Sequence, residues 1–327
     1  MAVKRQTAAQ TLEEVATWRP ALEPVLQSFV PIFTAQEELV QALAGHPAVT
    51  GHALPPMTDE RAEQGLSLLA GASFTGLAEC LRQCAVRLVP LVAALETVSP
   101  CQKALATFAN PGKAGDKRLE TLMAAIAGDD RAAVRRLAEA AKLPPEVLGF
   151  VGGFVVAPVL RALVRHMQPD SLSAEDAAPW DRDGGAWKHG YCPVCGALPS
   201  LAWLEKPGVD AKNPFLVAGG GKKHLHCGVC GADWKYRRGA CPSCGAEGSK
   251  VLEILRETGV SHGERLEWCT SCKGYCPCVD LREREFVPDF NALPLGLMHL
   301  DMVAARKKLR PLRVTFWNMS GDATARE

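Results

Sequence analysis

The sequence lacks a long uninterrupted apolar segment. Its longest apolar run, Val147 to Leu160, has fourteen residues, which include three glycines and Pro158. A membrane-spanning helix requires about 20 predominantly apolar residues. The first ten residues carry charges but are not followed by an apolar core, so no export signal is visible. We therefore expect a cytoplasmic protein with no membrane span.

An excess of charge of one sign is also missing, because 37 Lys and Arg residues balance 36 Asp and Glu residues and the net charge is +1. This balance argues against nucleic-acid binding through the overall field of the protein. The sequence does contain one local basic cluster, formed by Lys222, Lys223, Lys235, Arg237, Arg238 and Lys250. We interpret this cluster as compensation for the charge of metal-bound thiolates nearby, and nucleic-acid binding is the alternative.

The cysteines are not scattered as in a secreted disulfide framework, because ten of the thirteen lie between Cys192 and Cys278. Eight of them form four Cys-x-x-Cys pairs, which are Cys192 and Cys195, Cys227 and Cys230, Cys241 and Cys244, and Cys269 and Cys272. A two-residue gap allows the chain to fold into a knuckle whose two sulfurs point at one metal ion. A glycine that would relieve the turn follows three of the pairs, whereas Lys273 follows the fourth.

Eight thiolates in this spacing predict two tetrahedral metal sites with four cysteines each. Iron and zinc both accept such a cage, so the residues do not distinguish between them. Strand-like segments between the knuckles would form hairpins, which favours pairing the first knuckle with the second and the third with the fourth. A cross-braced pairing is the alternative. A closed four-sulfur site offers no open position for a substrate, which favours a protein that is not an enzyme.

The two halves of the chain have different periodicities. Apolar residues recur at three- and four-residue steps up to about Met167, which predicts helices, whereas knuckles alternate with strand-like segments later. We expect a multidomain protein with α and small β parts: an N-terminal helical bundle, two tandem rubredoxin-like or zinc-ribbon metal modules, and a short C-terminal helix. The predicted boundaries are 1–167 for the helical domain, 168–187 for a linker, 188–240 and 241–290 for the modules, and 291–327 for the C-terminal helix and tail.

Two further groups could take part in chemistry. Cys276 and Cys278 follow the last knuckle and exceed the eight ligands, so they are additional thiols: a redox dithiol, ligands of a labile third site or alternate ligands, or simply reduced cysteines. His224 and His226 alternate on a strand before the second knuckle. Because four cysteine pairs leave no ligand position vacant, we expect exposed strand histidines.

The order of the segments YCPVCGALPS, HLHCGVCGADW, RRGACPSCG and WCTSCKGY, followed by LMHLD at Leu297 to Asp301, resembles the formate dehydrogenase accessory protein family, FdhE. The resemblance covers most of the chain. It implies a role in the assembly or activation of a molybdenum- or tungsten-dependent formate dehydrogenase, through contact with its catalytic subunit. It also implies iron, held in rubredoxin-like sites by the eight paired cysteines. Cys276 and Cys278 depart from the family pattern.

A maturation factor needs a surface that recognises its partner. We predict that Trp234, Arg237, Arg238 and Tyr275 contribute to it, because aromatic and Arg side chains in exposed loops often carry binding energy. The alternative for Trp234 and Tyr275 is that they pack against their own knuckles. Two other functions remain open, a rubredoxin-like electron-transfer protein and a nucleic-acid-binding zinc-ribbon protein.

Overall fold

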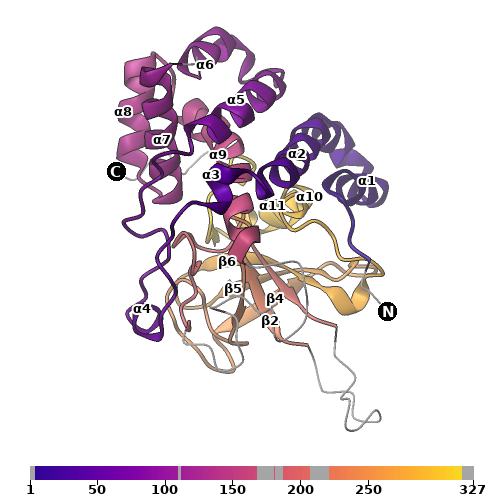
Figure 1. Cartoon of the computed structure of the whole chain (residues 1–327). Helices are drawn as coiled ribbons and strands as arrows, with labels where there is room; N and C mark the ends of the chain where they lie inside the picture. Colours follow the sequence, from indigo (N-terminus) through magenta and orange to yellow (C-terminus); the bar gives the residue numbers. More distant parts are fainter. Residues whose placement is uncertain (1–3, 110–111, 168–179, 181–186, 207–220, 319–327) are drawn as a thin grey trace.

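The apolar stripes of the first 167 residues form helices that pack around one central helix, and a sheet lies at the other end of the molecule (Figure 1). The computed structural model describes residues 4–109, 112–167, 180, 187–206 and 221–318. The helices of the N-terminal part are α1 (Ala8–Trp18), η1 (Pro20–Leu22), α2 (Glu23–Ala44), α3 (Pro47–Thr50), α4 (Asp59–Glu63), α5 (Ala78–Ala93), η2 (Ser99–Cys101), α6 (Gln102–Phe108), α7 (Lys113–Ala127), α8 (Arg131–Ala141) and α9 (Pro145–Met167).

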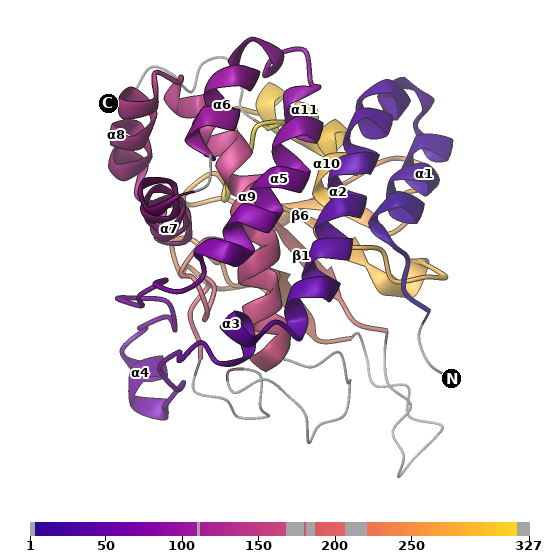
Figure 2. The same cartoon turned by 45° about the horizontal axis from the view of Figure 1, so that its top comes forward.

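Helix α9 is the centre of this part and contacts α2, α5, α7 and α8 (Figure 2). By length and composition it could cross a membrane, but 72% of its most apolar window is buried inside the structure. Here it acts as the core helix around which the others pack. The helix is longer than the apolar run in the sequence because Arg161 and the residues after it continue the same helix.

Pro158 lies inside α9 without ending it. Proline has no N–H, so the carbonyl oxygen of Phe154, one turn earlier, loses its usual helical partner. Gln36 of α2 replaces that partner, because its Nε2 donates to the Phe154 oxygen at 2.8 Å. A neighbouring helix therefore satisfies the carbonyl group that the proline leaves without a helical partner, and this contact fixes α2 against α9.

The sheet combines strands from both cysteine-rich segments. Its strands are β1 (Leu201–Leu204), β2 (Lys223–His226), β3 (Asp233–Tyr236), β4 (Leu252–Arg256), β5 (Glu264–Cys269), β6 (Gly274–Asp280) and β7 (Arg310–Pro311). The order is β3-β2-β1-β6-β5-β4, and β7 pairs with β6. β1 and β2 form one antiparallel hairpin, as do β4 and β5, and a parallel pairing of β1 with β6 joins the two halves.

The helical part, the small sheet and its two cysteine clusters agree with the predicted fold class of a helical domain followed by zinc-ribbon-like modules. The boundary predicted at residue 240 falls between β3 and β4, and the strands on both sides of it belong to one sheet. The predicted linker, 168–187, lies outside the described residues except for Trp180 and Trp187. Helices α10 (Leu293–Gly296) and α11 (Met298–Arg306) form the predicted return to helix, after the short η4 (Leu281–Glu283).

The helices and the sheet share one hydrophobic core. At one edge of the junction, Trp18 of α1 stacks on His262, with ring centroids 3.7 Å apart. Next to this stack, the buried carboxylate of Glu264 pairs with Arg19 at 2.7 Å and with Arg284 at 2.6 Å. Aromatic packing and ion pairs from three separate segments therefore hold α1 against the sheet.

Candidate metal centres

The four knuckles have the same local backbone geometry. In each, the residue after the second cysteine donates its N–H to the carbonyl oxygen of the first cysteine, at 2.8 to 3.0 Å. That residue takes a left-handed conformation in all four, with φ of 78° at Gly196, 75° at Gly231, 73° at Gly245 and 60° at Lys273. The glycines explain why the turn forms easily in three knuckles. Lys273 adopts the same left-handed conformation although it is not a glycine. The fourth knuckle therefore keeps the backbone geometry of the other three without the glycine.

The structure groups the cysteines as the hairpins predicted, first knuckle with second and third with fourth. In the first group, Cys192 lies 3.4 Å from Cys230 and Cys195 lies 3.4 Å from Cys227, measured between sulfurs. All four of these side chains are buried. Backbone N–H groups of Val194 and Cys195 point at the sulfur of Cys192, at 3.4 and 3.5 Å. Such N–H donors stabilise negative charge on a thiolate.

The second group is more open. The sulfurs of Cys241 and Cys272 are 3.7 Å apart, and those of Cys244 and Cys269 are 3.8 Å apart. Cys241 and Cys269 are buried, Cys272 is half-buried, and Cys244 is exposed. The two groups therefore have the same ligands but differ in access to solvent.

The sulfur geometry fits a tetrahedral metal ion. A metal with bonds to sulfur of about 2.3 Å separates its sulfurs by about 3.8 Å, whereas a disulfide requires about 2.05 Å. The distances of 3.4 to 3.8 Å match the first arrangement and not the second. Burial raises the pKa of the Cys192 and Cys230 thiols well above the ordinary value, so a cation is needed to hold four thiolates together there. Either iron or zinc would fit this donor set.

The helical part encloses the first site. The backbone N–H groups of Leu68 and Leu69 donate to the carbonyl oxygens of Pro193 and Val194 in the first knuckle, at 2.9 and 2.8 Å. Arg161 of α9 donates to the carbonyl oxygen of Gly228 in the second knuckle at 3.2 Å. Four thiolates around a divalent ion carry an excess of about two negative charges, and Arg161 supplies a positive charge beside them.

Arg161 was not predicted as part of the site. The sequence offered one signal, that an arginine directly follows the long apolar run. Its guanidinium also donates to Oε1 of Gln36 at 3.1 Å, and Gln36 in turn satisfies the Phe154 carbonyl. A continuous set of polar contacts therefore runs from the proline position of α9 to the first metal site.

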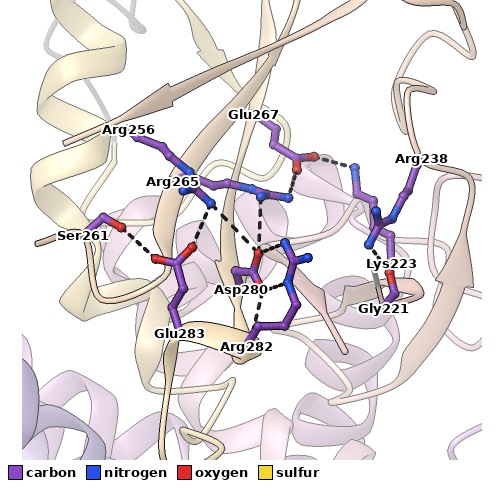
Figure 3. A network of polar contacts seen from close by, with 10 residues as sticks. All are labelled: Gly221, Lys223, Arg238, Arg256, Ser261, Arg265, Glu267, Asp280, Arg282 and Glu283. Atoms are coloured by element: carbon purple, nitrogen blue, oxygen red, sulfur yellow. Dashed lines mark hydrogen bonds and ion pairs between the residues drawn. The ribbon is translucent and has the colours of Figure 1, made fainter. Parts of the chain in front are cut away.

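Cys276 and Cys278 lie on β6, outside both four-cysteine groups. They are opposite Glu267 and Arg265 of β5. Burial raises the pKa of Cys276 to about 12, so its thiol is neutral near pH 7. The neighbouring charges satisfy one another instead: Glu267 contacts Lys223 at 2.6 Å and Arg265 at 2.9 Å, within the polar network of Figure 3.

The expectation that the two strand histidines are exposed was wrong. His224 and His226 are 4% and 2% exposed, so both side chains are buried in the fold. His224 stacks on Trp203 at 4.1 Å and contacts Glu205 at 2.5 Å. His226 contacts Asp233 at 3.1 Å and Asn291 at 3.2 Å, so both rings are structural groups with polar partners.

Trp234 and Tyr275, predicted as partner contacts, are 0% and 2% exposed. Trp234 lies on β3, where it is paired with Leu225 of β2, and the hydroxyl of Tyr275 donates to Asp301 of α11 at 2.7 Å. Neither side chain can contact a partner in this fold, which corrects that prediction. Arg237 and Arg238 are exposed, as expected. Arg237 pairs with Glu247, and Arg238 donates to the carbonyl oxygen of Gly221.

The burial of the Asp301 carboxyl makes stability depend on pH. Burial raises the pKa of Asp301 from 3.8 to about 6. The folded state thus holds this proton more tightly than the unfolded state, so the stabilisation is fully present below pH 3.8 and is lost as the pH rises through 6. Asparagine stays neutral and can still accept from Tyr275. We expect wild type to lose on the order of 1 to 2 kcal/mol relative to Asp301→Asn between pH 5 and 8, measured by urea unfolding. A difference that stays constant over this range would contradict the assignment.

Comparison with known proteins finds a relative by sequence and a similar solved structure. No family model matches the chain. The chain is 29% identical over 143 residues to a protein named FdhE homolog from Aquifex aeolicus (strain VF5), and this match spans 43% of the chain and 46% of that relative, about half of its length. Among solved structures, the FdhE protein from Pseudomonas aeruginosa matches with a TM-score of 0.60 over 96% of this chain and 95% of that one, at 18% identity. At that identity the structural match establishes the fold. Together, the sequence match and the shared fold confirm the resemblance to FdhE proteins that the cysteine motifs indicated.

Proposed function

We propose that this protein is a cytoplasmic, non-catalytic accessory protein that supports the assembly or activation of a formate dehydrogenase by binding its catalytic subunit. The observation that carries the proposal is the FdhE fold, which extends over 96% of the chain. Two complete four-cysteine groups support it, because each supplies every ligand of a tetrahedral ion and leaves no position for a substrate. The metal then acts through structure or electron transfer.

The proposal predicts a direct complex. Tagged protein, purified anaerobically with its metal, should retain the catalytic subunit of a formate dehydrogenase in a pull-down at a one-to-one ratio. The Cys241→Ser/Cys244→Ser variant, which keeps the first site, shows whether the second site contributes to binding. The absence of a complex under both reducing and oxidising conditions would contradict the proposal.

Iron is the metal that we propose for both sites, on the basis of the resemblance. Zinc has the same geometry, so the decision rests on spectroscopy and metal analysis. Ferric tetrathiolate is coloured and zinc tetrathiolate is not. Anaerobically purified protein should therefore show visible absorption and contain two iron atoms per chain, and colourless protein with two zinc atoms would overturn the assignment.

An electron-transfer role is the second candidate, and the exposure of Cys244 favours it. A redox centre exchanges electrons with a partner only when it lies close to the surface, and the second site meets this condition. Protein loaded with zinc distinguishes the two candidates. If zinc-loaded protein activates the dehydrogenase as well as iron-loaded protein does, electron transfer is excluded and the accessory role remains.

A further inference from the structure

The basic cluster of the sequence forms an open groove in the fold. The groove has a volume of about 450 Å³ and lies between the start of β2, the end of β3 and the segment after β3. Six cationic side chains line it: Lys188, Lys222, Lys223, Lys235, Arg237 and Arg238. Among the described residues, no Asp or Glu lines it. Figure 3 shows Arg238 beside Lys223 and Gly221 at this edge of the sheet.

Charge compensation of the metal sites does not account for this groove. The first site already has Arg161, and one tetrathiolate site carries an excess of only about two negative charges. Lys223 is buried and paired with Glu267, so it forms the floor, whereas Lys188, Lys222, Arg237 and Arg238 are exposed. Lys223 and Arg237 are paired with Glu267 and Glu247, whereas within the described residues Lys188 and Arg238 form no ion pair. A concave surface rich in cations favours a complementary anionic partner.

The groove lies next to the exposed metal site. The hydroxyl of Tyr236, which lines the groove, donates to the carbonyl oxygen of Cys241 at 3.1 Å. Arg237 pairs with Glu247, which follows the third knuckle closely in sequence. Both side chains of this pair are more than half exposed, so an incoming carboxylate can replace Glu247 at little cost. A ligand in the groove would thus lie beside the second four-cysteine group.

We propose that this groove binds an acidic polypeptide segment of the client protein. The identity of the client, a formate dehydrogenase, rests on the proposed function. Polypeptide fits better than nucleic acid because proteins that bind single-stranded nucleic acid usually combine a basic groove with exposed aromatic rings on which bases stack. The two aromatic residues of the groove do not provide them: Trp187 is 5% exposed and Tyr236 is 9% exposed. Carboxylates need only the cations.

Binding of defined probes to the purified, metal-loaded full-length protein tests this proposal. The probe is a fluorescein-labelled decapeptide of alternating Glu and Gly, followed by fluorescence anisotropy. A Gln and Gly decapeptide and a labelled thymidine decamer serve as comparisons. We expect the acidic peptide to bind, the neutral peptide not to bind, and the affinity to fall as salt is raised from about 50 to 300 mM. Equal binding of the neutral peptide, or tighter binding of the thymidine decamer, would overturn the proposal.

A pair of matched variants locates the binding site. Arg237→Ala/Arg238→Ala should raise the Kd for the acidic peptide about 30-fold, which corresponds to about 1 kcal/mol for each of the two lost charge contacts. Arg135→Ala/Arg136→Ala removes two adjacent exposed arginines from α8, far from the groove, and should leave the Kd unchanged. Lys188→Ala is a second groove variant, at an exposed position. Metal content confirms that each variant is folded, and equal effects of both arginine pairs would overturn the location.

The test separates this inference from the proposed function. The peptide assay uses the protein alone, whereas the accessory role is tested by the pull-down of a formate dehydrogenase subunit. If the pull-down succeeds and the groove variant binds the subunit and the peptide as wild type does, the groove is wrong and the accessory role stands. If the peptide binds through the groove and the pull-down fails, the groove stands and the client must be another acidic protein.

Discussion

Cys192→Ser/Cys195→Ser is expected to abolish the stable fold, whereas Cys241→Ser/Cys244→Ser should leave most of it intact. A structural tetrathiolate site contributes on the order of 10 kcal/mol to folding, which is comparable to the whole stability of a typical domain. The first site is buried and its knuckles are bonded to Leu68, Leu69 and Arg161 of the helical part. Its loss therefore removes both a metal ion and the docking of sheet against helices.

The second site lies at the surface, and its loss should remain local. Cys241→Ser/Cys244→Ser should keep one metal per chain and the far-UV signal of the helices, with new proteolytic cleavage confined to about 241–280. Metal analysis, thermal unfolding and limited proteolysis of the two variants check this difference. Equal loss of stability in both variants would show that the continuous sheet, through the pairing of β1 with β6, transmits the damage from either site.

The sequence predicts the ligands of the two metal sites but not the difference in their exposure. Ligand identity and pairing were predictable, because a knuckle is formed by five neighbouring residues and each hairpin returns the chain to its start. The burial of the two sites was not predictable. The Cys-x-x-Cys spacing is the same in both, and only the helical part, which packs over Pro193 and Val194 but not over Cys244, makes them different.

The sheet shows a second limit of prediction from sequence. The hairpins β1–β2 and β4–β5 follow from local alternation and turns, but the parallel pairing of Ala202 with Cys278 joins residues far apart in the chain. No local pattern encodes that contact. Because β6 occupies the centre of the sheet, Tyr275 is buried rather than presented to a partner. The wrong prediction for this residue arose from treating the modules as separate units.

The charge of Arg161 should control the affinity of the first site for its metal. The Gly231 backbone lies against this side chain, since a Cβ placed on Gly231 would be 3.0 Å from Cγ of Arg161. The guanidinium donates to Gly228 and to Gln36, so the helix holds a fixed positive charge over the second knuckle. Removing a group that supports metal ligands typically lowers metal affinity about 10- to 100-fold. Substitution of Arg161 therefore tests whether helix α9 contributes to metal binding at the first site.

We expect Arg161→Met, which keeps most of the side-chain volume, to weaken metal binding about 10- to 100-fold at the first site only. Competition with a chelator, followed by metal analysis, measures the two sites in the same molecule, so the second site is an internal reference. Arg161→Lys retains the charge and should show a smaller effect. Arg165→Met, one turn further along α9 and exposed, is the matched control and should leave both affinities unchanged. If Arg161→Met releases both metals at the same chelator concentrations as wild type does, the first site does not depend on the charge that α9 supplies.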